Sequence, residues 1–386
     1  MPLFLILFLS IYGGLHAYTF FRLRTAFSPR RSASLFLIAI FLFMTFAPLL
    51  VRFSEHAGMD RCAIIIAWPA YLWMGFIFIF ASLLFLVDLI KLGYQLANLL
   101  ISTSPPAFLA PPFTCGFAFF LSIAAGCYAC FEARQIRSEQ ITIETTKLSR
   151  ENKKIRIVQM SDVHIGMLFR EERLERVLKV IREAKPDIIV STGDLVDGKL
   201  NREYVKFQQD TLAAMLASLK APAGKYAVAG NHEFHAGIKE SLAFTTAAGF
   251  TVLRNESAQL ANGMIITGAD DQIVSGKRSK AKTSNAEKRV LEIVPKKAFH
   301  LFLKHRPDIS ATTDGLFDLQ LSGHVHNGQI FPFNLLVKLK HPISCGTTTT
   351  SAGSRIHVSR GTGTWGPPMR LFAPPEVTVI DIVPKP

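Results

Sequence analysis

Five short clusters between residues 161 and 326 carry side chains that bind divalent metals. They read Ser161-Asp162-Val163-His164, Gly193-Asp194, Gly230-Asn231-His232-Glu233, Lys304-His305-Arg306 and Gly323-His324-Val325-His326. Carboxylate, amide and imidazole groups supply the oxygen and nitrogen donors that such cations prefer. One cluster alone says little, since a Gly-Asp pair is usually a turn and a single histidine usually fills a core or surface position. Together, the clusters predict a metal centre.

Short apolar runs typical of buried strands precede most of these clusters. Four of them are IRIVQM (155–160), PDIIVS (186–191), GKYAVA (224–229) and FDLQLS (317–322). Apolar residues at helical spacing predict one helix between the first two runs, ending near Lys185-Pro186, and a second helix over 203–220. Strands that alternate with helices predict an α/β sheet, and loops at the carboxyl ends of such strands can converge.

The ordered series Asp-x-His, Gly-Asp, Gly-Asn-His-Glu, His and Gly-His-x-His resembles the calcineurin-like metallophosphoesterases, specifically their membrane-associated bacterial branch. The resemblance covers residues 155–386 and extends to Gly328-Gln329-Ile330 and to residues 358–364. It implies two mixed sheets flanked by helices, and a metal-dependent hydrolase of phosphoric esters.

The resemblance also implies a ligand set for two divalent ions. Asp162, His164 and His326 would bind one ion; Asn231, His305 and His324 would bind the other; and Asp194 would bridge them. Mn²⁺ is the first expectation, with Fe, Zn or Mg as alternatives. The resemblance assigns His232 to the substrate.

The chemistry expected of such a centre needs no serine or cysteine nucleophile. A divalent ion can lower the pKa of a bound water from 15.7 to around 7, so that water itself attacks phosphorus. A histidine can protonate the leaving oxygen or stabilise the transition state, and His232 is the candidate. Glu233 is expected to orient and charge the imidazole of His232. Asp197 and Asp270-Asp271 lie near ligand loops and could support the ligands, but they are left out of the expected site because such aspartates are commonly caps. His300 is close enough to His305 to be a rival ligand, but it is expected to be structural because it lies in an apolar run.

The first third of the chain is too apolar for a soluble protein of this size. Residues 2–21, 32–51, 63–87 and 107–131 contain no Lys, Arg, Asp or Glu, and each is long enough to cross about 30 Å of hydrocarbon. We therefore expect an all-α, multi-pass anchor over residues 1–131, a charged linker over 132–154 and the phosphoesterase domain over 155–386. A buried helical hairpin is the alternative for the third and fourth segments, because prolines interrupt both.

Charged residues beside the apolar segments give conflicting evidence on orientation. Arg22, Arg24, Arg30 and Arg31 favour a cytoplasmic first loop, which with four spans would export the catalytic domain. Arg134, Arg137, Lys147 and Arg150 favour the opposite arrangement. The face is left open, with a preference for the cytoplasm.

The formal net charge of +14 predicts an anionic partner. An anionic membrane surface explains the charge with fewer assumptions than nucleic acid, because the chain has no zinc-finger spacing, aromatic RNA-binding signature or basic-zipper heptad. Residues 277–306 hold ten basic and two acidic residues. This segment is either a solvated loop or an arm that holds lipid headgroups.

These features predict a membrane-anchored phosphoesterase acting on a lipid-linked or membrane-associated substrate. Two alternatives remain open: a UDP-2,3-diacylglucosamine pyrophosphohydrolase of lipid A synthesis, and a membrane-tethered nuclease. The oligomeric state is not predicted by the sequence.

Overall fold

The computed structural model describes residues 2–101, 104, 106–148, 154–198, 203–271 and 280–385. The chain divides into two compact units. The helical unit contains Met1–Phe131 and Gly366–Leu371, and the sheet unit contains Glu132–Trp365 and Phe372–Pro386.

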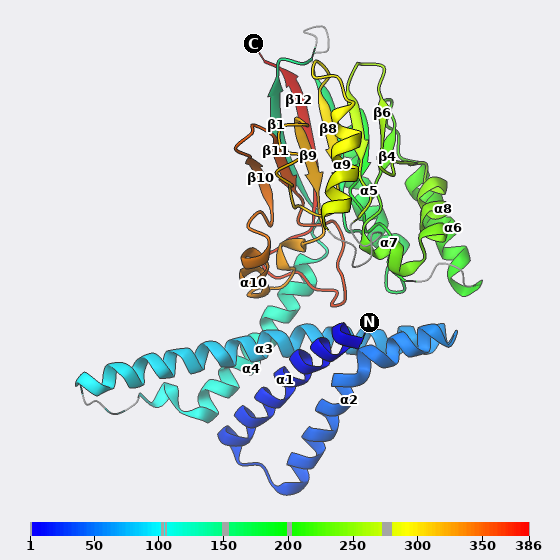
Figure 1. Cartoon of the computed structure of the whole chain (residues 1–386). Helices are drawn as coiled ribbons and strands as arrows, with labels where there is room; N and C mark the ends of the chain where they lie inside the picture. Colours follow the sequence, from blue (N-terminus) through cyan, green and yellow to red (C-terminus); the bar gives the residue numbers. More distant parts are fainter. Residues whose placement is uncertain are drawn as a thin grey trace. The chain divides into compact units, whose positions relative to one another are not determined.

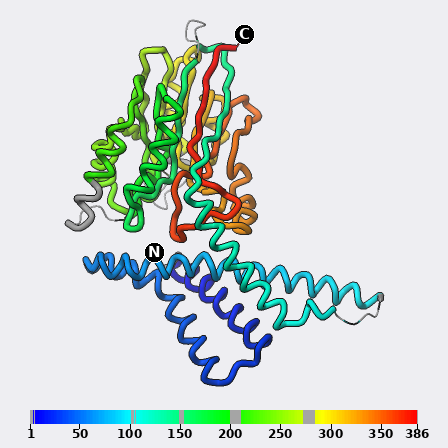
Figure 2. The backbone as a smooth tube through the Cα atoms, turned by 180° about the vertical axis from the view of Figure 1, so that it is seen from behind, coloured from blue at the N-terminus to red at the C-terminus, as the bar shows by residue number. Residues whose placement is uncertain are grey.

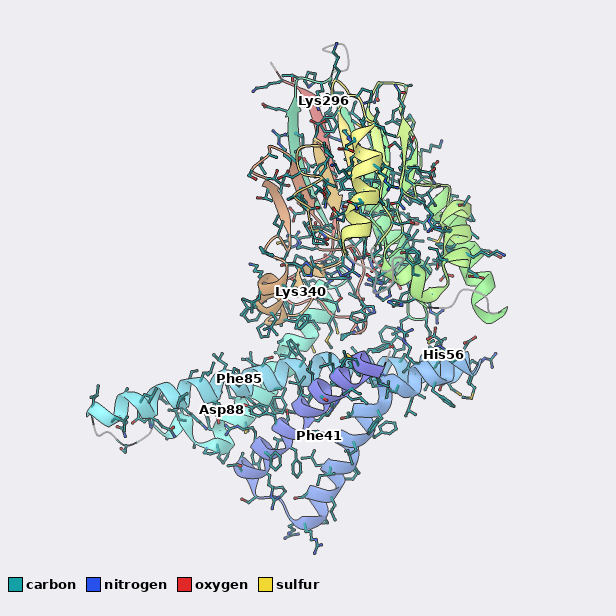
Figure 3. The ribbon with its side chains drawn as sticks, in the orientation of Figure 1. Phe41, His56, Phe85, Asp88, Lys296 and Lys340 are labelled. Carbon is teal, nitrogen blue, oxygen red and sulfur yellow. The ribbon has the colours of Figure 1, made fainter. Side chains whose placement is uncertain are left out.

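The helical unit is built from α1 (Pro2–Phe27), α2 (Arg31–His56), α3 (Asp60–Ile101) and α4 (Pro111–Glu132), with a 3₁₀ turn at Ala107–Leu109 (Figure 1). Each α-helix has a stretch long and apolar enough to cross a membrane. Helices α1, α2 and α3 pack on one another. Tyr12, Phe41, Ile77 and Leu84 are buried in this unit, whereas Phe85, labelled in Figure 3, and many other large apolar side chains are exposed, as expected of surfaces that face lipid.

Helix α3 is longer than the expected span. It continues through Pro69 to Ile101 and contains 42 residues. At 1.5 Å per residue this is roughly twice the length needed to cross the hydrocarbon. Proline therefore does not interrupt this segment, and Pro111 begins α4 rather than breaking it. The later segment Gly366–Leu371 joins the same unit, where the Arg370 amide donates to the Ala129 carbonyl at 2.9 Å.

The first sheet of the sheet unit is mixed. In the described residues its order is β1 (Arg137–Thr145), β12 (Glu376–Pro384), β2 (Ile155–Met160), β3 (Ile188–Ser191), β4 (Lys225–Ala227) and β5 (Thr251–Val252). Strands β2 to β5 are parallel, whereas β12 is antiparallel to β2. Three of the four strands expected from the sequence therefore lie here, with β2 at the expected bounds.

The second sheet is also mixed. Its order within the described chain is β10 (Gly346–Thr349), β11 (Arg355–Val358), β9 (Leu319–Ser322), β8 (His300–Leu303), β7 (Ile265–Gly268) and β6 (Glu256–Gln259). Its four central strands are parallel, and β6 and β10 run antiparallel to their neighbours. The expected fold of two mixed sheets is confirmed.

Helices cover the outer faces of the two sheets (Figure 1). Helices α5 (Glu171–Ala184), α6 (Glu203–Ala217) and α8 (Ile238–Ala247) bury apolar residues against the first sheet. Helix α9 (Lys280–Glu292) buries Leu291 against Phe302 and Phe317 on the second sheet's side. The inner faces meet through Ile157 and Val190 from one sheet and Leu319 and Leu321 from the other. One apolar core therefore holds the two sheets together.

The expected linker over 132–154 is wrong for most of its described length. Residues 137–145 form β1, which pairs in parallel with β12 from Arg137↔Glu376 to Thr145↔Pro384. Figure 2 shows these two strands side by side from behind. The charged residues obscured an alternation in which Ile141 and Ile143 pack into the core between the sheets. Residues 149–153 lie outside the described residues.

The basic segment over 277–306 is also not the solvated loop considered above. Residues 280–292 are helical, while Lys277 and Arg278 lie outside the described residues. Lys304 is buried and lies 2.9 Å from Glu287, and Arg306 lies 2.8 Å from Asp271. These two cations are paired within the domain and are not free to hold headgroups.

Candidate metal centre

All five metal-competent clusters lie immediately beyond the carboxyl ends of strands. Asp162 and Asp194 follow β2 and β3, and Asn231 begins the short helix α7 (Asn231–Ala236) beyond β4. His305 and His324 follow β8 and β9 of the other sheet. Gln159 of β2 donates from Nε2 to the Ser322 carbonyl of β9 at 3.0 Å, which fixes the two sheets at this edge. The site therefore combines loops from both sheets.

One group of side chains is formed by Asp162, His164 and His326, whose ligand atoms lie within 4.8 Å of one another. The two imidazole Nε2 atoms are 3.0 Å apart, and His326 Nε2 is 3.4 Å from Asp162 Oδ1. All three residues are buried. Converging nitrogen and oxygen donors in a buried pocket are the arrangement that a divalent cation requires.

A second group is formed by Asp194, His305 and His324. His305 Nε2 lies 3.1 Å from Asp194 Oδ2 and 3.1 Å from His324 Nδ1. Burial alone would lower the pKa of His305, but the charges of Asp194 and Asp162 raise that pKa to about 10. The buried carboxylates thus favour positive charge at this position, which a bound divalent ion would also supply.

Two buried atoms near the site lack hydrogen-bond partners, and one of them fits a metal ligand. Within the described chain, His164 Nδ1 and Asn231 Oδ1 are buried and have no hydrogen-bond partner. Buried polar atoms are normally satisfied, so such orphans need an explanation. A metal ion would satisfy Asn231 Oδ1, which the sequence assigned as a ligand. The structure thus brings Asp162, His164 and His326 together, and Asp194, His305 and His324 together. The bridging role of Asp194, the role of Asn231 and the binding of metal remain our proposal.

The backbone of the site is held in an unfavourable conformation. Asp162, His164, Asp194, His324 and His326 have φ values between +49° and +74°. Residues other than glycine rarely adopt this left-handed region, and strain of this kind concentrates at functional sites. Local sequence preference does not select these angles, so the surrounding sheets impose them.

Two motif glycines allow the ligand loops to approach one another. A Cβ atom on Gly230 would collide with the Asp194 carboxylate, and one on Gly323 would collide with Ser161 and with the Asp162 carboxylate. The glycines are therefore required by close packing around the ligands.

His232 lies at the border of the first group, and with His164 and Asp197 it forms a third group whose possible ligand atoms lie within 4.8 Å of one another. Its ring is 4.7 Å from the His164 ring, and its Nδ1 is 2.9 Å from Asp197 Oδ1. Burial would lower the pKa of His232, but the hydrogen bond with Asp197 and the charges of Asp194, Asp197 and Glu233 raise it to about 9. A protonated His232 at neutral pH suits a group that donates a proton or binds an anionic phosphoryl oxygen.

The expected role of Glu233 is wrong in its main part. Its carboxylate accepts hydrogen bonds from the amides of Asp194, Val196 and Gly230 at 3.0, 3.0 and 2.7 Å. Glu233 thus fixes two ligand loops together and acts on His232 only through its charge. Asp197, which sequence reasoning left out, orients the imidazole instead. Its position three residues after Asp194 in the same loop was the available signal.

Arg306 is a second residue that sequence reasoning missed. Its Nη1 lies 2.9 Å from His324 Nε2, and its Nε donates to Asp271 at 2.8 Å. His300, by contrast, points away from the site: its two ring nitrogens meet Thr267 Oγ1 at 2.7 Å and the Leu316 carbonyl at 2.9 Å. The expectation that His300 is structural agrees with this geometry.

We expect Asp197→Asn to reduce kcat about 10–100-fold, the usual effect of removing a partner that orients a working histidine. Asparagine keeps the shape of the side chain but removes the charge that favours protonated His232. KM and metal content should stay unchanged, which kinetics and elemental analysis would measure. Loss of a metal ion would make Asp197 a ligand and contradict this role.

Comparison with known proteins agrees with this geometry. Residues 155–328 match the calcineurin-like phosphoesterase family model. An uncharacterized metallophosphoesterase of Aquifex aeolicus is 41% identical over 264 residues, which cover 68% of this chain and 98% of that protein. The chain belongs to the calcineurin-like phosphoesterase family.

Other members of the family combine the domain with membrane segments. A transmembrane protein with metallophosphoesterase domain from Danio rerio is 29% identical, over 62% of this chain and 56% of that protein. Among solved structures, a dimetal phosphatase from Danio rerio covers 54% of this chain and 87% of its own, with 14% identity and a TM-score of 0.38. The named transmembrane relative and the four apolar helices support membrane association of this family member.

Proposed function

We propose that the protein is a membrane-anchored phosphoesterase that uses two divalent metal ions to hydrolyse a phosphoester or pyrophosphate bond in a membrane-associated substrate. The observation that carries the proposal is the convergence of Asp162, His164 and His326, and of Asp194, His305 and His324, into two adjacent donor groups. Asn231, whose buried Oδ1 has no hydrogen-bond partner, would complete the second group as the family resemblance implies. Mn²⁺ is the first choice of metal on the family resemblance, with Fe, Zn or Mg as alternatives.

The bound ions would supply positive charge for the phosphoryl group and an acidified water. The remaining steps belong to side chains of this chain. Asp197 holds Nδ1 of His232, which leaves Nε2 as the nitrogen available to the substrate. His232 can then protonate the leaving oxygen or stabilise charge on phosphorus. Trp365 forms part of the surroundings of His232, because the two rings lie 5.6 Å apart.

Two features support a membrane-associated substrate. Only residues 133–136 connect α4, which ends at Glu132, to β1, which begins at Arg137. A four-residue connection spans at most about 14 Å, so an inserted α4 would keep the sheet unit close to the bilayer. A net charge of +14 favours anionic lipid surfaces over neutral ones.

The full-length protein in detergent, stripped of metal with a chelator, tests this proposal. We expect no hydrolysis before metal is added, and hydrolysis on addition of Mn²⁺, Fe²⁺, Zn²⁺ or Mg²⁺. The substrates would be a lipid phosphomonoester, a lipid-linked pyrophosphate such as a UDP-diacylglucosamine, a soluble diester and nucleic acid.

The pattern of substrates decides between the functions. Hydrolysis of lipid substrates supports the proposal. Cleavage of nucleic acid alone, with a steep dependence on salt, would replace it by a tethered nuclease. Hydrolysis that survives the chelator would contradict the metal mechanism.

A further inference from the structure

Helix α10 (Phe333–Lys340) exposes its apolar side chains. Leu335, Leu336 and Leu339 are 54%, 59% and 83% exposed, whereas Val337 packs against the cluster of Val325, Ile356 and Val358. A surface helix of a soluble protein normally buries its leucines and exposes its polar residues. Here three leucines of one eight-residue helix face outward, and a contiguous exposed apolar patch marks an interaction site.

The charges of α10 border the leucines on both sides. At about 100° per residue, Leu335, Leu339 and Leu336 occupy one arc of about 100°, with Lys338 beside one edge and Lys340 beside the other. Both lysines are exposed. Lysines that flank an apolar face are typical of helices lying in a membrane interface, because their long stems reach the headgroups while leucines enter the acyl region.

Aromatic side chains outside the helix extend the same kind of surface. Phe331 precedes α10 and is exposed, and its ring lies 5.9 Å from the ring of Phe372, which is also exposed. We name Phe331, Leu335, Leu336, Leu339 and Phe372 the apolar rim. Aromatic and leucine side chains together are the composition of membrane-interface elements.

The apolar rim is continuous with the candidate metal centre. Phe331 follows His326 by five residues, through the short turn η3 (His326–Gly328). At the other end of α10, the ring of His341 lies 6.2 Å from the ring of His324. Gln329 holds the backbone of Trp365 through two hydrogen bonds of 2.9 Å, and Trp365 contacts His232. The segment that carries α10 therefore begins at His326 of the metal centre and ends with His341 near His324.

We infer that the apolar rim enters the headgroup and acyl boundary of the bilayer and holds the hydrophobic part of a lipid whose phosphate occupies the metal centre. This inference rests on the proposed phosphoesterase function and names its substrate class, an anionic phospholipid or lipid-linked phosphate. The apolar rim supplies the site for the acyl chains, and Lys338 and Lys340 supply charge for neighbouring anionic headgroups. The position of the surface beside the site distinguishes this role from attachment to the membrane, which α1–α4 already provide.

A fluorescent probe tests the docking independently of catalysis. We would attach bimane to Leu339→Cys in the full chain, with the five native cysteines replaced by serine or alanine, and reconstitute it in vesicles of phosphatidylcholine and phosphatidylglycerol. Ile293→Cys is the matched control, because Ile293 is 75% exposed. It lies three residues before Lys296, and Figure 3 shows Lys296 and Lys340 at opposite ends of the sheet unit.

The expected result is quenching of the probe at position 339 by lipids that carry a doxyl group on the acyl chain, with no quenching at position 293. Equal quenching at both positions, or none at position 339, would overturn the inference. Cross-linking of two copies through position 339 without quenching would instead assign the surface to a protein interface.

Substitution of the leucines tests the link to the substrate. In Leu335→Gln/Leu336→Gln/Leu339→Gln, hydrolysis of a phospholipid or lipid-linked phosphate in vesicles should fall on the order of tenfold, since interfacial binding scales with buried apolar area. Hydrolysis of a soluble diester should change much less, and Ile293→Gln should affect neither substrate. Equal loss on both substrates, or no loss on either, would overturn the inference. If the wild-type protein hydrolyses no phosphoester at all, the proposed function fails, while probe quenching still reports docking.

Discussion

Asp194→Asn is expected to abolish turnover while leaving the protein folded. In the structure Asp194 Oδ2 lies 3.1 Å from His305 Nε2, and Asp194 Oδ1 accepts a hydrogen bond of 2.8 Å from the backbone amide of His232. Two ions held about 3.5–4 Å apart repel one another, and a shared carboxylate lowers that cost. Asparagine keeps one oxygen and the size of the side chain but removes the negative charge. The second ion should therefore be lost, and the phosphoryl group would lose its main source of stabilising charge.

The measurements are turnover, metal content by elemental analysis and thermal unfolding. Asp210→Asn is the matched control, because Asp210 is an exposed residue on α6. The control should keep both metals and full activity. Near-normal activity of Asp194→Asn with two bound metals would refute the dinuclear mechanism. Unfolding of the variant would show that Asp194 acts on stability, and Asp194→Glu would then test the charge alone.

The ligand set could be predicted because metal chemistry restricts the residue types and strand ends restrict their positions. Asp162, Asp194 and His305 each follow an apolar run, and parallel strands bring such loops to the same edge. The grouping into two sets came from the family resemblance, since spacing alone could not show which loops of the two sheets meet. Membership in the family confirms the fold, whereas metal binding by these residues remains a prediction.

The partners of the ligands could not be read from the sequence in the same way. Glu233 was assigned to the imidazole of its neighbour, but three amides of two ligand loops surround its carboxylate instead. Asp197, in the loop after Asp194, instead forms the hydrogen bond with the imidazole of His232. Hydrogen-bond partners depend on loop geometry, which is determined neither by residue type nor by the spacing of apolar residues along the chain.

Charge also misled the prediction of strands and exposed surfaces. The charged residues of 132–154 indicated a solvated linker, yet the alternation of Ile141 and Ile143 is sufficient for an edge strand. For α10 no prediction was made from the sequence, and the structure shows that Val337 faces inward while the leucines do not. Amphipathic pattern identifies a face but does not say whether protein or lipid covers it.

His232→Ala should separate catalysis from metal binding. His232 is held by Asp197 at 2.9 Å and lies 4.7 Å from the ring of His164. These three residues form a third group of possible ligand atoms, but the family resemblance assigns His232 to the substrate and not to a metal. We expect turnover to fall about 10²–10⁴-fold, the usual range for a group that transfers a proton or stabilises the transition state. Metal content should stay at the wild-type value.

The comparison of leaving groups identifies which of these roles His232 performs. If His232 protonates the leaving oxygen, the loss in His232→Ala should be large for an alkyl ester and small for a nitrophenyl ester, whose leaving group needs no proton. If it stabilises charge on phosphorus, both esters should lose the same factor. Asp197→Asn added to His232→Ala should cause little further loss, because Asp197 acts through the imidazole and the two effects are not additive. A full additional loss in the double variant, or the disappearance of one metal from His232→Ala, would show that His232 belongs to the metal centre itself.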